Sequence, residues 1–204
     1  MKKSLVFFLI NLAIGQKVFS QTFSLVKDIR PGATSSAPDE LAVFNSKLYL
    51  RANNGVNGNE LHVTDGTDAG TMMVKDIRPG ASGGSVALLS VINNKLSFFS
   101  NDGSGLGTEL WASDGLEAGT VFVKDINTGS GSSMGAFYAN LNNYKYFDGT
   151  VNDISGPVTE LWRTDGTDAG TTLVKAIRSV GAGGSSPRSL ITIGNQLFFY
   201  ADDG

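Results

Sequence analysis

Short apolar stretches alternate with turn-forming residues along most of the chain, and the alternation repeats with a regular period. In the first complete period the alternation predicts four strands, at residues 41–44, 47–52, 60–64 and 72–77. A polar/apolar period of two is typical of half-buried β-strands, and Asn-rich pairs between such segments favour tight hairpins. The chain is therefore expected to consist of antiparallel hairpins.

The same order of strands recurs later in the chain. Opening hairpins are predicted at residues 88–92 with 95–100, at 137–147, and at 190–193 with 196–200. A lone strand at 23–29, which resembles the fourth strand of a unit, comes before the first complete unit. We interpret it as a strand that could complete a final unit of a longer protein.

One phrase marks the end of each unit. It reads ELHVTDGTDAGTMMVKDI at 60–77, ELWASDGLEAGTVFVKDI at 109–126 and ELWRTDGTDAGTTLVKAI at 160–177. Its valine falls at Val26, Val74, Val123 and Val174, at intervals of 48, 49 and 51 residues. Four strands in 40–50 residues are typical of a β-propeller blade. We predict an all-β, propeller-like array of four-stranded antiparallel blades, with an open β-repeat array as the alternative.

The repeat also divides the chain. We expect a signal peptide at 1–20, a partial unit at 21–36, complete units at 37–85, 86–134 and 135–186, and a second partial unit at 187–204. Propellers usually contain four to eight blades. The chain is therefore interpreted as an incomplete propeller, namely the N-terminal fragment of a larger one.

The phrase predicts its own hairpin, with turns at 65–70, 114–119 and 165–170. In the simplest register Thr64 faces Thr71 and Glu60 faces Lys75, so that opposite charges lie across the two strands, as do Glu109 with Lys124 and Glu160 with Lys175. The carboxylates of Asp65, Asp114 and Asp165 are expected to accept backbone hydrogen bonds. Gly66, Gly70 and their equivalents are expected to allow positive φ.

The N-terminus resembles a secretory signal. Lys2 and Lys3 precede an apolar run over residues 5–15, and Ser20 offers a cleavage point before Gln21. The run is shorter than the roughly 20 residues that span a bilayer. We therefore predict an exported chain, secreted or held at the cell surface, with no membrane span in its mature part.

Composition narrows the candidate chemistry. The chain has no Cys and one His, which excludes disulfides and thiolate sites and leaves little general-base or metal-ligand chemistry. A formal net charge of −3 argues against a nucleic-acid partner. We predict no catalytic residue and no cofactor-binding residue, and His62, in a position that holds Trp in the other copies, is interpreted as structural.

The phrase resembles the ELWxxDGT repeat family, and the similarity extends over residues 23–204, including the flanking VKDIRPG. This resemblance implies a bacterial secreted or cell-surface protein with a propeller-like β fold. Some family members carry a C-terminal sorting domain, and the family implies no defined activity. His62 for Trp, Leu116 for Thr and Ala176 for Asp are departures from the pattern.

Two further interpretations remain open. The acidic pairs of the turns are low-ranked calcium candidates, since calcium prefers six to eight oxygen ligands, and turn capping is the competing interpretation; these residues are Asp65, Asp68, Asp114, Glu117, Asp165 and Asp168. The loops at 53–59, 101–108 and 148–159 vary while the hairpins do not. We therefore expect a scaffold that binds an unknown protein or glycan, or alternatively the N-terminal part of a glycan hydrolase whose active site needs further blades.

Overall fold

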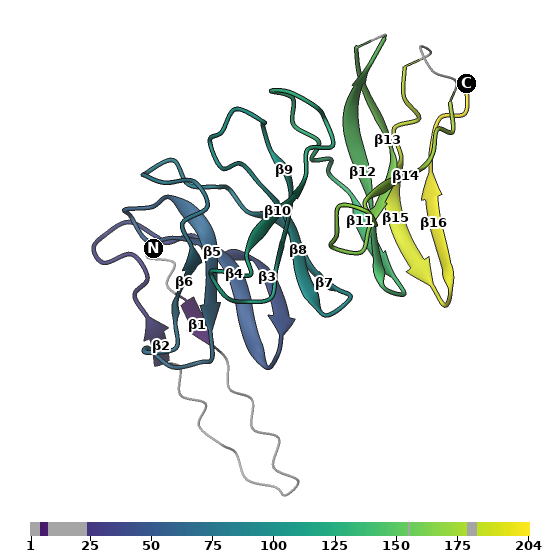
Figure 1. The fold of residues 1–204 in the computed structure, drawn as a ribbon. Coiled ribbons are helices and arrows are strands. Elements are labelled where there is room, and N and C mark those ends of the chain that lie inside the picture. The colour runs from purple at the N-terminus through teal and green to yellow at the C-terminus, as the bar shows by residue number, and fades with distance from the viewer. Residues whose placement is uncertain (1–4, 8–23, 155, 179–182) are drawn as a thin grey trace, which may run out of the picture.

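Antiparallel β-sheet makes up the computed structural model of the chain (Figure 1), which describes residues 5–7, 24–154, 156–178 and 183–204. These residues form strands, turns and loops, without a helix. The described part of the chain therefore contains no helix that is long and apolar enough to cross a membrane. The expectation of an all-β fold is confirmed.

Three four-stranded sheets form the body of the molecule. The first contains Asp39–Phe44 (β3), Lys47–Asn53 (β4), Asn59–Thr64 (β5) and Met72–Lys75 (β6). The second contains Ala87–Ile92 (β7), Lys95–Ser100 (β8), Glu109–Ser113 (β9) and Val121–Lys124 (β10). The third contains Tyr138–Leu141 (β11), Tyr144–Asp153 (β12), Gly156–Thr164 (β13) and Thr172–Lys175 (β14). Each sheet pairs its strands antiparallel and in chain order, as the repeat predicts.

Two-stranded sheets lie beside this body. Arg188–Ile193 (β15) pairs with Gln196–Tyr200 (β16), and Leu5–Phe7 (β1) pairs with Ser24–Lys27 (β2). Strand β2 confirms the strand predicted at 23–29 over residues 24–27. Apart from β1, the predicted signal peptide lies outside the described residues, and its removal remains a prediction.

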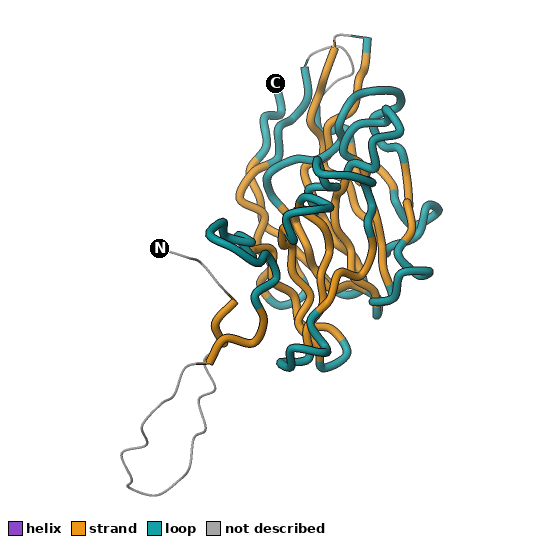
Figure 2. Tube along the Cα trace, turned by 90° about the vertical axis from the view of Figure 1, so that its left-hand side faces the viewer, coloured by secondary structure: helices purple, strands orange, loops and turns teal. Residues whose placement is uncertain are grey.

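The sheets stand side by side in a row. The first strand of each sheet lies against the first strand of the next, β3 with β7, β7 with β11 and β11 with β15. All four hairpins between first and second strands point to the same end, which is the lower end in Figure 1. The strand axes are roughly aligned with one another, and the loops gather at the ends of the strands (Figure 2).

Apolar side chains fill the spaces between consecutive sheets. Phe98 and Phe99 are neighbours on β8 and both are fully buried, because one faces the first sheet and the other faces the third. Phe98 belongs to a cluster with Leu61 and Trp111, and Phe99 packs edge-on against Phe147. The middle sheet is thus covered on both faces.

The predicted pairing of Glu60 with Lys75 is wrong. Thr64 and Thr71 do face each other, with their hydroxyl oxygens 2.7 Å apart, but a β-bulge then shifts the register so that Lys75 lies opposite Leu61. A bulge adds one residue to one strand and changes the pairing beyond it. Bulges at the equivalent place set Lys124 opposite Leu110 and Lys175 opposite Leu161, so the other two Glu–Lys pairs are wrong as well.

The loop predicted at 148–159 is also wrong. Strands β12 and β13 continue to pair through this region as far as Asp153 opposite Gly156. Loops do occupy most of 53–59 and all of 101–108, as expected. The third sheet therefore carries an extended hairpin where the first two carry Gly-rich loops.

Candidate functional site

The turn aspartates bind their own turns. Asp65 Oδ1 accepts a hydrogen bond of 2.9 Å from the backbone N–H of Thr67, and Asp114 and Asp165 accept equivalent bonds of 2.9 Å. Gly66 has a φ of 93°, as the turn requires. Gly70 differs from expectation, because it is absent from the positive-φ residues and a Cβ there would lie 2.0 Å from Asp65 Oδ1. Gly70 is therefore needed because a larger residue would collide with the Asp65 carboxylate.

The second acidic residue of each turn contacts the preceding sheet. Lys27 Nζ donates to the carbonyl oxygen of Asp68 at 3.0 Å, and Lys75 and Lys124 reach the carbonyl oxygens of Glu117 and Asp168 in the same way. Lys124 also forms an ion pair of 2.8 Å with the Asp168 carboxylate. The lysine of the phrase thus connects successive sheets.

These contacts bear on the calcium hypothesis. Within the described residues, no group of three or more His, Cys, Asp or Glu side chains is arranged to hold a metal ion. Capping of the turn is the interpretation that the hydrogen bonds of Asp65, Asp114 and Asp165 support.

The glutamates of the phrase bind the linker that leads to the next sheet. Glu60 is fully buried, and its Oε1 accepts bonds from the backbone N–H groups of Arg78 at 3.0 Å and Gly84 at 2.6 Å. Glu109 Oε2 accepts from Ile126 N–H at 2.8 Å, and Glu160 Oε1 accepts from Ser185 N–H at 3.1 Å. Burial raises the pKa of Glu60 to about 7 and raises the pKa of Glu109.

His62 lies inside the structure. It is 2% exposed, and its Nδ1 is 3.0 Å from the carbonyl oxygen of Glu60. Burial lowers the pKa of this imidazole. These contacts agree with a structural role, because the ring occupies the place that Trp111 and Trp162 take in the other two sheets.

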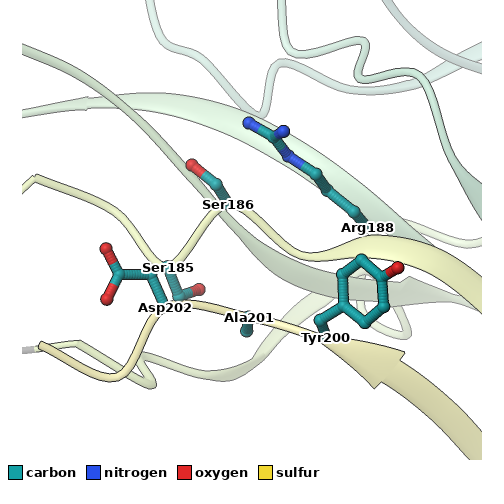
Figure 3. A pocket seen from close by; sticks show the side chains of 6 residues that line it. All are labelled: Ser185, Ser186, Arg188, Tyr200, Ala201 and Asp202. Atoms are coloured by element: carbon teal, nitrogen blue, oxygen red, sulfur yellow. The ribbon is translucent and has the colours of Figure 1, made fainter.

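A hollow opens at one end of the β15–β16 hairpin, beside the linker that leads into β15. Its volume is about 360 Å³, and it is lined by Ser185, Ser186, Arg188, Tyr200, Ala201 and Asp202. The side chains of Ser186 and Arg188 extend to the same side of β15, and the ring of Tyr200 stands beside them on β16 (Figure 3). Tyr200 lies directly across the pair of strands from Arg188.

A second hollow of about 260 Å³ adjoins the first and shares Ser186 and Arg188 with it; its other lining residues are Ala136, Phe137, Asp148, Thr159 and Pro187. Asp148 is buried, and its two oxygens accept bonds from the backbone N–H groups of Ala136 at 3.0 Å and Phe137 at 2.8 Å. Burial raises the pKa of Asp148, while Arg188 acts in the opposite direction. We call the two hollows together the Arg188 hollow.

The sequence held a signal for this site that the repeat analysis did not use. Arg188 and Tyr200 occupy a cross-strand position that holds Asp39 with Arg51 in the first sheet and Ala87 with Phe99 in the second. The pair differs among these three hairpins, whereas the ELW phrase hardly changes. Side chains that depart from a repeat mark the places where one unit differs chemically from the others.

Lys145 is a second departure from the repeat. It lies on β12 where Leu48 and Leu96 lie on their own second strands, opposite the residue that ends each third strand. Its fully buried Nζ donates to the carbonyl oxygens of Leu88 and Ser97. Burial lowers its pKa to about 7. Because it lines neither hollow, we interpret Lys145 as part of the contact between the second and third sheets.

Comparisons of the chain with protein-family models, curated proteins and solved structures gave no significant match. The functional argument therefore rests on the geometry of the chain itself.

Proposed function

We propose that the chain is an exported or cell-surface scaffold that binds a glycan in the Arg188 hollow. The observation that carries this proposal is that the repeated and the variable polar residues have different surroundings. The repeated acids and lysines, such as Glu60, Asp65 and Lys75, are engaged in bonds within and between sheets. The residues that vary between units gather in an open hollow, where they remain available to a ligand.

A propeller-like arrangement is part of the same proposal. Contacts between successive first strands support it, because the innermost strands of a propeller surround a common axis. Leu41 and Val43 on β3 are each more than half exposed. We infer that another sheet of the same kind packs on this apolar face.

The chemistry of the hollow favours a glycan over a protein surface. Protein interfaces usually centre on a broad, apolar and well-packed patch. The Arg188 hollow instead combines hydroxyl groups of Ser186 and Thr159 with a guanidinium and an exposed aromatic ring. A sugar presents both hydroxyl groups and an apolar face of C–H groups, and this mixture of groups complements both.

A binding experiment tests the proposal. The full chain would be screened against immobilised polysaccharides, and affinity for any that bind would be measured by calorimetry for the native chain and for Tyr200→Ala. We expect the substitution to weaken binding about tenfold, which corresponds to a loss of about 1.4 kcal/mol of aromatic contact.

Tyr144→Ala provides the matched control, because Tyr144 lies at the far end of the third sheet beneath Arg163. It should leave the affinity unchanged. Absence of binding to every polysaccharide, or equal losses in the two variants, would overturn the proposal. No observation in the described residues favours the hydrolase alternative, which needs two positioned carboxyl groups.

A further inference from the structure

The guanidinium of Arg188 forms neither an ion pair nor a hydrogen bond with the described residues, and the residue is exposed at the hollow. Burial raises the pKa of Asp148, which lines the same hollow, and the charge of Arg188 still opposes this rise. Arg51 belongs to the equivalent cross-strand pair of the first sheet, where the arginine lies on the second strand and the residue opposite it is acidic. There the guanidinium forms an ion pair with Asp39 and donates to the carbonyl oxygen of Val86 at 2.9 Å.

Arg51 and Arg188 differ in their contacts because the residues opposite them differ. In the β15–β16 hairpin the residue opposite the arginine is Tyr200, whose side chain is a phenol and not a carboxylate. The aromatic ring is 65% exposed. The hairpin thus presents a cation and a ring on one surface, where the first sheet presents a closed ion pair.

The acidic groups nearby are engaged elsewhere. Asp202 Oδ2 accepts from Arg178 at 2.7 Å, and Asp202 Oδ1 accepts from the backbone N–H of Gly204 at 3.0 Å. Asp148 holds two backbone N–H groups, as described above. Neither carboxylate forms a hydrogen bond or an ion pair with Arg188, although the charge of Arg188 acts on Asp148 from a greater distance.

We propose that the Arg188 hollow selects a glycan that carries a carboxylate, such as a uronic acid. The proposal rests on the glycan-binding function proposed above. The planar guanidinium matches a carboxylate through two parallel hydrogen bonds. The Ser186 hydroxyl lies on the same side and supplies a polar contact to a sugar hydroxyl, while the Tyr200 ring covers the apolar face of the sugar.

The net charge of the chain does not favour an acidic glycan, so such a glycan must be recognised by particular residues. The formal net charge is −3, so a polyanion gains no general attraction from this protein. Binding of an acidic glycan must therefore depend on a specific cation. This makes the effect of a single arginine measurable.

The test compares two forms of one probe. Oligogalacturonate with free carboxylates and the same oligomer with methyl-esterified carboxylates differ in charge but retain the same sugar ring. We expect the free acid to bind the native chain at least tenfold more tightly, and Arg188→Gln to abolish this preference. Arg188→Lys, which keeps the charge but not the planar pair of donors, should restore only part of it.

Arg163→Gln is the matched control, because Arg163 lies over the Tyr144 ring away from the hollow. It should preserve the preference for the free acid. Dextran sulfate against dextran distinguishes a carboxylate site from a general anion site, and tighter binding of the sulfated polymer than of oligogalacturonate would overturn the carboxylate assignment. Equal binding of both oligogalacturonate forms would overturn this inference while leaving glycan binding intact, whereas no binding to any sugar would overturn both proposals.

Discussion

Buried carboxyl groups are the residues in which the fold and its chemistry are most closely coupled. Glu60 is fully buried and binds backbone N–H groups of the next linker through Oε1, while its Oε2 has no hydrogen-bond partner among the described residues. Removal of a carboxylate from water favours its neutral form. The same residue therefore joins two sheets and makes that junction sensitive to pH.

Glu60→Gln should make stability less dependent on pH. The pKa of Glu60 is about 7 in the folded chain and about 4.5 in the unfolded one, so the stabilisation is fully present below pH 4.5 and is lost as the pH rises through 7. The loss should reach about 3 kcal/mol in the native chain. Urea unfolding between pH 4 and pH 8 should show this decline, and the Gln variant, which cannot ionise, should show a flatter profile.

Asp76 is the charged neighbour that also raises this pKa. Glu117→Gln is the control, because Glu117 is an exposed glutamate in a turn. Its profile should follow that of the native chain. Parallel profiles for Glu60→Gln and the native chain would show that Glu60 does not govern the effect.

At the scale of elements, local patterns predicted the hairpins well and the register only in part. Alternating residues and Asn-rich turns located nearly every strand, because both signals act over neighbouring residues. The bulge opposite Leu61 left no such signal, and it moved Lys75 from the predicted partner Glu60 to the neighbouring sheet. The extended β12–β13 hairpin was missed for a related reason, since its strands contain Gly149 and Pro157, which favour a loop when read alone.

Gly119→Ala should destabilise the middle hairpin. A Cβ at this position would lie 2.0 Å from Asp114 Oδ1, which accepts the N–H of Leu116, so the turn must move or lose its cap. Overpacking of this kind costs about 1–3 kcal/mol. Thermal or urea unfolding would measure it.

A double-mutant cycle with Asp114→Ala identifies the cause. Removal of the carboxylate also removes the clash, so Gly119→Ala should cost much less in the Asp114→Ala background than in the native chain. Additive losses would mean that the backbone, and not the aspartate, excludes a side chain at residue 119.

At the scale of the whole molecule, the row of sheets brings together residues that the repeat does not relate. The Arg188 hollow takes Asp148 from β12 and Arg188 and Tyr200 from the next hairpin. Sequence analysis could predict that successive units stack, but not which side chains would meet between them, because that depends on the distance and twist between sheets. The departures from the repeat were visible in the sequence, but the meeting of these side chains in one hollow was not.

The row of sheets should protect backbone amides unequally from hydrogen exchange. The middle sheet is covered on both faces, and every residue of β9 is buried, whereas β16 alternates between exposed and half-buried residues and pairs only with β15. In repeat architectures stability is close to a sum of terms for each unit and its neighbouring contacts. We expect hydrogen exchange measured by mass spectrometry to be slowest in β8 and β9 and at least tenfold faster in β15 and β16. Uniform rates across all sheets would show that the chain opens as one cooperative unit, so that the contacts between sheets would be as strong as those within them.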